Sequence, residues 1–251
     1  MHQLQAFYES IDPAGVMQPI AAVYDDTVTT NGDDMRVPPE MPFLLGEMAF
    51  INDVTVANRA AITAPSLRQF AAYEIAPIVE AAVMSNPPAA DMHPMSPIQL
   101  VPDESMNFEV LSNPAAAAAH YGLVVMGDGA LQPVQGAIYT VRATASITNV
   151  LGSWVAGALT LGEDLPIGNY NVVGMRVLEA TSVAARLIFK GSASRPGCPC
   201  VADEDNLDVP YFRKGGLGIW GQFHTNTPPS LEILGAAGAV TPVVMLDLMA
   251  A

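Results

Sequence analysis

Residues 139–148 alternate between apolar and polar side chains, with apolar residues at the odd positions and polar ones at the even positions. Successive side chains of a β-strand point to opposite faces, so this alternation predicts a strand with one buried face and one solvent-exposed face. Residues 182–190 show a similar pattern, with Val183, Ala185, Leu187 and Phe189 on one face of a predicted strand. We expect Val141, Ala145, Val183, Leu187 and Phe189 to be buried, and Arg142 and Arg186 to face solvent or a partner.

Short extended segments recur through the second half of the chain, separated by turn signals such as Gly127-Asp128-Gly129 and Pro228-Pro229. Strands at such spacing are typical of β-sandwiches and barrels. The sequence therefore predicts an all-β protein, an antiparallel β-sandwich of jelly-roll type with one or two short helices. The strands are expected at residues 98–101, 106–112, 120–126, 138–148, 154–161, 170–178, 182–190, 217–224, 231–234 and 243–248.

The first hundred residues are patterned less regularly. Strands are expected at 20–30 and 41–51, with Asn31-Gly32 between them as a hairpin or loop signal. Residues 66–76 predict a short helix capped by Ser66, and a strand over the same residues is the alternative.

Four prolines between residues 86 and 97 predict a linker. We therefore expect an N-terminal arm or small subdomain at residues 1–95 and the sandwich at residues 96–251. The arm is too apolar to remain in water, so it is expected to pack on its own domain or on neighbouring copies.

The chain is acidic and otherwise poor in charge, with a net charge of -15 and 14% charged residues. A surface of this kind repels phosphate, and residues 1–35 contain no Lys or Arg, so no direct nucleic-acid binding is expected. The N-terminus lacks the basic and apolar regions of a signal peptide. Residues 143–162 are uncharged, but their alternation favours two strands and a turn over a transmembrane helix.

Candidate chemistry is sparse. The four histidines, His2, His93, His120 and His224, show no metal-ligand spacing, and no nucleophile elbow is present. The glycines of residues 215–218 are interpreted as a tight turn. We therefore expect no enzymatic activity, no cofactor, and no catalytic or metal-binding residue.

Three further groups have both a structural and a functional interpretation. Cys198 and Cys200 are interpreted as reduced structural thiols in a loop. The acidic groups Asp25-Asp26 and 203–208 are interpreted as solvated loops, with calcium binding at Asp203, Glu204, Asp205 and Asp208 as the alternative. The aromatic cluster Tyr211, Phe212, Trp220 and Phe223, beside Arg213, is interpreted as core or subunit contact, with a carbohydrate platform as the alternative.

Residues 98–249 resemble the jelly-roll coat proteins of non-enveloped viruses and phages. The resemblance rests on the strand succession and on the stretches LPIGNYNVVGMR at 165–176 and GIWGQFHTN at 218–226. It implies a self-assembling capsid subunit located in the virion and assembled in the host cytoplasm, whose partners are copies of itself and other virion proteins. A carbohydrate-binding β-sandwich module and a tail or fibre component are the alternatives.

Overall fold

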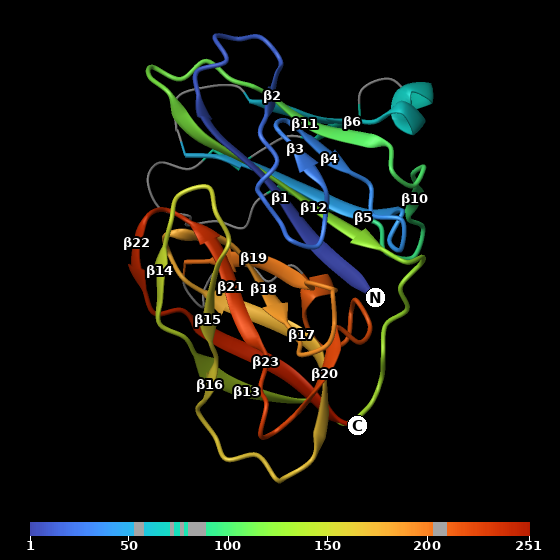
Figure 1. Cartoon of the computed structure of the whole chain (residues 1–251), viewed down its shortest axis with the longest axis vertical. Coiled ribbons are helices and arrows are strands. Elements are labelled where there is room, and N and C mark those ends of the chain that lie inside the picture. Colours follow the sequence, from blue (N-terminus) through green and yellow to red (C-terminus); the bar gives the residue numbers. More distant parts are fainter. Residues whose placement is uncertain (53–57, 71–72, 76–77, 80–88, 203–209) are drawn as a thin grey trace. The chain divides into compact units, whose positions relative to one another are not determined.

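The computed structural model describes residues 1–52, 58–70, 73–75, 78–79, 89–202 and 210–251. Its regular structure there is almost entirely β-strand (Figure 1), with two short 3-10 helices, η1 (Pro65–Phe70) and η2 (Pro210–Phe212). Most strand pairs are antiparallel. The all-β class with antiparallel sheets is therefore confirmed, whereas jelly-roll connectivity stays a prediction. Among the described residues, no helix has the length and hydropathy needed to cross a bilayer.

The chain divides into two compact units. The N-terminal unit comprises Gln5–Ala130, and the C-terminal unit comprises Leu131–Ala251 together with Met1–Leu4. The division falls after Ala130 and not at the expected 95/96 boundary, because strands from both sides of residue 95 pair within the N-terminal unit. The described strands before residue 95 therefore belong to a packed unit, which agrees with the subdomain alternative and not with an extended arm.

The N-terminal unit contains two sheets. The first has the order β1-β12-β5-β10, with β8 and β9 also paired to β5, and the second has the order β3-β4-β11-β6-β7, with β2 also paired to β11. The first sheet's strands are β1 (His2–Ile11), β5 (Phe43–Ile51), β8 (Ile78–Val79), β9 (Ala89–Met92), β10 (Ile98–Gln99) and β12 (Ala118–Gly127). The second sheet's strands are β2 (Gln18–Ile20), β3 (Thr30–Asn31), β4 (Asp34–Arg36), β6 (Arg59–Thr63), β7 (Tyr73–Ile75) and β11 (Ser105–Leu111).

Apolar side chains from both of these sheets form one core. Strand β11 alternates between partly buried and buried residues, as a strand with one packed face should. Its Phe108 ring lies 5.6 Å from the ring of Phe7 on β1. Gly122 on β12 leaves room for the Phe108 ring, because a Cβ there would lie 2.5 Å from ring carbons.

The C-terminal unit is built on a nine-stranded sheet of order β15-β21-β18-β19-β17-β23-β13-β16, with β20 also paired to β17, and on the two-stranded β14-β22. Most of these strands lie in regions expected to be strands, but β19 and β22 were not expected, and only the second half of the expected 217–224 forms a strand. They are β13 (Tyr139–Thr144), β14 (Ile147–Asn149), β15 (Val155–Ala158), β16 (Thr160–Leu161), β17 (Asn169–Leu178), β18 (Ser182–Ile188), β19 (Gly197–Val201), β20 (Gly221–His224), β21 (Ser230–Gly235), β22 (Gly238–Val240) and β23 (Val243–Ala250).

The burial predicted for the five apolar residues is confirmed, and the exposure predicted for Arg186 is wrong. Arg142 is exposed as expected, but Arg186 is 1% exposed, because both faces of β18 are covered. The Arg186 Nε donates to Glu232 at 2.6 Å, and its guanidinium lies 4.1 Å from the centre of the Trp154 ring. The five apolar residues expected to be buried are all buried: Val141, Ala145, Val183, Leu187 and Phe189.

Other local predictions need correction. The strand expected at 20–30 does not form, since only its first residue lies in β2 and only its last in β3; Asn31-Gly32 lies at the turn from β3 into β4. Within 66–76, the described residues form the 3-10 helix η1 and then strand β7, because β7 pairs with β6. Part of the expected linker is strand β9, held by β5; residues 86–88 of that linker lie outside the described residues.

Candidate functional site

The four histidines do not meet in the structure. Both His120 ring nitrogens are engaged, by Ser112 at 2.6 Å and by the Ala118 carbonyl at 2.8 Å, so His120 connects β12 to the residue that follows β11. His2 is buried with its ring edge-on to Trp220 at 4.8 Å. His224 borders a hollow of about 160 Å³ that Lys190 also lines.

The aromatic cluster is mostly interior. Phe212, Trp220 and Phe223 are buried, and Phe212 and Trp220 contact each other at 6.4 Å between ring centres. A carbohydrate platform requires rings open to solvent, so this arrangement favours the core interpretation. Gly215 and Gly218 have φ values of +82° and +73°, as the tight-turn interpretation requires.

The cysteines lie in strand β19 and not in a loop. Both are buried and free, and burial raises the pKa of the Cys200 thiol well above its usual value. Of the acidic groups, Asp25 is buried and accepts hydrogen bonds from the Thr27 amide and hydroxyl, both at 2.7 Å. The proposed calcium ligands at 203–208 lie outside the described residues.

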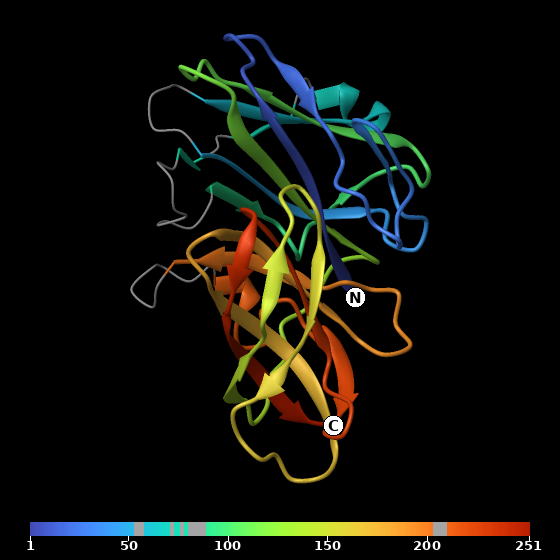
Figure 2. The same ribbon diagram turned by 60° about the vertical axis from the view of Figure 1, so that its left-hand side comes forward.

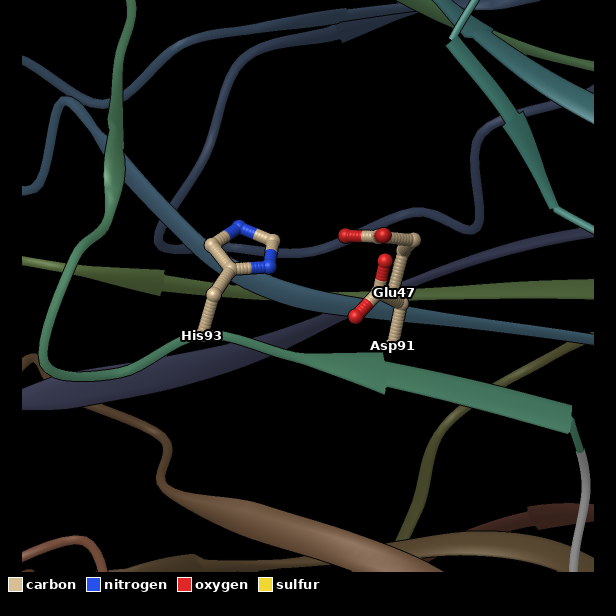
Figure 3. A group of neighbouring side chains, drawn as sticks. All are labelled: Glu47, Asp91 and His93. Atoms are coloured by element: carbon tan, nitrogen blue, oxygen red, sulfur yellow. The ribbon is translucent and has the colours of Figure 1, made fainter.

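A group that the sequence analysis did not single out lies in the N-terminal unit (Figure 3). Glu47, Asp91 and His93 each offer one potential metal-ligating atom, and these atoms all lie within 4.8 Å of one another. We call these three residues the Glu47 cluster. Glu47 comes from β5, Asp91 from β9, and His93 from the residue that follows β9. All three side chains are grouped on one side of the β5–β9 pair, with a His93 ring nitrogen facing the carboxylates (Figure 3).

Strand pairing explains why these residues meet. Glu47 and Asp91 are register partners in the antiparallel β5–β9 pair, and the His93 amide donates to the Leu45 carbonyl at 2.8 Å. Residues two apart on a strand share a face, which brings Asp91 and His93 to the same side. Gly46 permits the close approach of β9, because a Cβ at Gly46 would lie 2.7 Å from the Asp91 carbonyl oxygen.

Glu47 is the unusual member of the cluster. It is 0% exposed, and neither of its carboxylate oxygens has a hydrogen-bond partner. On its other side, β12 places the apolar Val124 opposite it. Buried polar groups are normally hydrogen-bonded, so an unsatisfied buried carboxylate requires an explanation. The Tyr73 hydroxyl donates to Asp91 Oδ2 at 3.3 Å and lies close enough to Glu47 to influence its pKa.

The electrostatics reflect this burial. Burial raises the pKa of Glu47 to about 8, the Tyr73 hydroxyl opposes the shift, and the negative charge of Asp91 adds to it. Burial also lowers the pKa of His93, against the opposing influence of Asp91 and of the Leu44 backbone. His93 Nε2 is a further buried atom without a hydrogen-bond partner. The cluster therefore combines one imidazole with two carboxyl groups, and no basic side chain pairs with Glu47 among the described residues.

The sequence held two signals for this cluster. Glu47 is the one charged residue in the apolar run of β5, and Asp91-Met92-His93 has the one-residue spacing that puts two ligands on one strand face. The cluster forms because β9 pairs with β5, which brings together residues more than forty positions apart in the sequence. The interpretation of residues 86–97 as a linker did not predict this pairing.

A second feature of functional interest is the edge strand β15. Among the described strands it pairs with β21 alone, and it contains no charged residue. Ala156 and Ala158 are exposed, as are Val150 and Leu151 in the preceding turn. The yellow-green stretch that contains β14 and β15 lies on the near side of the C-terminal unit in Figure 2. Edge strands of natural monomers are usually protected by charge, proline or a covering segment, and β15 carries neither a charge nor a proline.

Comparison of the chain with protein-family models, with curated proteins and with solved structures found no match.

Proposed function

We propose that this protein is a structural, self-assembling subunit, and specifically a subunit of a virion shell. The observation that carries the proposal is the uncharged, exposed edge of β15. An open edge presents unpaired backbone N–H and C=O groups, and another copy of the chain satisfies them by adding a strand. The virion setting rests on the resemblance of residues 98–249 to jelly-roll coat proteins.

The surface around β15 supports an apolar contact. Val150 and Leu151 are 56% and 47% exposed, and both lie just before the edge strand. Burying such side chains between copies is favourable at roughly 25 cal/mol for each Å² of apolar surface. The uncharged window at 143–162 avoids like-charge repulsion between two copies of a protein whose net charge is -15.

The test is the mass of the full chain in solution, measured by sedimentation or light scattering over a range of concentrations. We expect oligomers, and we expect Ala156→Lys to shift them towards the monomer, because a charge on the edge opposes strand addition. The matched control is Val16→Lys, which puts the same charge at an exposed apolar residue of the N-terminal unit. A chain that stays monomeric, or an Ala156→Lys variant that assembles as well as the control, would contradict the proposal.

A further inference from the structure

We propose that the Glu47 cluster is a binding site for a divalent transition-metal ion, held by one carboxylate oxygen from Glu47, one from Asp91 and one ring nitrogen of His93. The site is independent of the assembly role proposed above. It lies in the N-terminal unit, and its argument rests on different residues from those of the β15 edge.

The first argument is the uncompensated Glu47 carboxylate. Both oxygens are buried without a hydrogen-bond partner, and a second carboxylate, Asp91, lies directly across the strand pair. Like charges placed opposite each other in an antiparallel pair are destabilising. The two carboxyl groups therefore cannot both ionise without repulsion, and a bound cation removes this repulsion and supplies a partner for Glu47.

The contrast with Arg186 and Glu232 sharpens this argument. These two residues are also register partners on neighbouring strands, and there the protein itself places opposite charges at 2.6 Å. In the Glu47 cluster the residue opposite the buried acid is another acid. No basic side chain pairs with Glu47 among the described residues, and a bound cation would supply the counter-charge that lets both acids ionise.

The second argument is the donor set. Two carboxyl groups with one imidazole suit zinc and neighbouring first-row ions, whereas calcium prefers six or more oxygen ligands. Ligands bonded at about 2.0–2.1 Å to a tetrahedral ion stand about 3.3 Å apart. The three ligating atoms lie within 4.8 Å of one another, so binding requires them to approach by up to about 1.5 Å. Asp91 is exposed, so the ion has a route from solvent and a position for water.

The experiment titrates the full-length, chelator-treated protein with zinc chloride in a calorimeter. We expect one equivalent to bind saturably, and we expect Asp91→Asn and His93→Gln each to weaken binding about tenfold or more. Asp91 is exposed and His93 lies outside the strands, so both variants should retain the far-ultraviolet circular dichroism of the parent protein. The matched controls are Asp33→Asn and His224→Gln, which should bind as the parent does.

Two further measurements make the assignment specific. Cobalt bound at the site should show no thiolate charge-transfer band, because its ligands are oxygen and nitrogen. Zinc should also slow amide hydrogen exchange in β5 and β9, the strands that the ion connects. Absence of saturable zinc binding, full binding by His93→Gln, a thiolate band from Cys198 or Cys200, or calcium binding that is as tight as zinc binding would each overturn the proposal.

Discussion

Glu47 and Asp91 lie directly opposite each other on the antiparallel strands β5 and β9, so two acidic side chains share one face of the sheet. Glu47 is fully buried and Asp91 is exposed. The pair thus runs from the interior of the N-terminal unit to its surface. The stability of the β5–β9 pair should therefore depend on how the two acids are neutralised, by protonation or by a bound cation.

The substitution Glu47→Gln should therefore have opposite effects without and with zinc. In chelator at pH 8.5, above the Glu47 pKa of about 8, we expect the variant to be more stable than the parent by roughly 1–3 kcal/mol, because a buried unpaired charge costs more than a buried amide. With excess zinc the order should reverse, because the variant loses a ligand. Urea unfolding followed by circular dichroism measures both differences, and the same order under both conditions would count against this account.

The substitution Gly46→Ala should loosen β9 from β5. A methyl group at residue 46 would collide with the Asp91 carbonyl and with the Met92 side chain, so the strands must separate. We expect faster amide exchange at residues 89–92 and weaker zinc binding. The control is Gly129→Ala, since nothing lies within 4 Å of a Cβ there, although its φ of +150° adds local strain. Unchanged exchange at 89–92 in Gly46→Ala would show that the close approach is not required.

The substitution Arg186→Met should destabilise the C-terminal unit by about 3–5 kcal/mol, the usual cost of removing one partner of a buried ion pair. Glu232 would lose its 2.6 Å partner and the Leu4 carbonyl would lose a donor at 3.2 Å. The exposed Arg142→Met is the control and should change stability by no more than about 0.5 kcal/mol. Both tryptophans belong to this unit, so their fluorescence follows its unfolding. Equal effects of the two substitutions would contradict the prediction.

Asp247 should make the C-terminal unit sensitive to acid. Its burial alone would raise the carboxyl pKa, but hydrogen bonds from Arg213, Thr140 and the Lys214 amide outweigh burial and lower it. A lowered pKa in the folded state means that the contribution to stability is complete above the unfolded value of about 3.9 and is lost as the pH falls through the folded value. We expect tryptophan fluorescence to report a urea midpoint that declines below about pH 4. Asp247→Asn should flatten this decline and the exposed Asp33→Asn should not.

Cys198 and Cys200 should resist alkylation in the native protein. They are 1% and 2% exposed, and the raised pKa of Cys200 leaves it as the unreactive thiol. We expect no labelling by iodoacetamide at neutral pH until urea unfolds the C-terminal unit, and then labelling of both. Mass spectrometry distinguishes these states, and rapid native labelling would show that β19 opens.

Local sequence determined the all-β class and much of the C-terminal unit. The alternation in 139–148 places Val141, Ala143 and Ala145 inside and Arg142 outside, because the two-residue period of a strand is a local property. The same two-residue period predicts an exposed Arg186, but Arg186 is buried, because β18 is covered on both faces. Covering of the second face depends on residues distant in sequence.

Tertiary structure alone decided the division of the chain and the Glu47 cluster. The prolines before residue 98 indicated a linker, yet β9 pairs with β5, and β10 to β12 complete the sheets of the N-terminal unit. Strand pairing is a long-range choice that depends on packing and on gaps such as the one left by Gly46, and no local pattern encodes it. For the same reason Glu47, Asp91 and His93 become neighbours only when β5 and β9 pair.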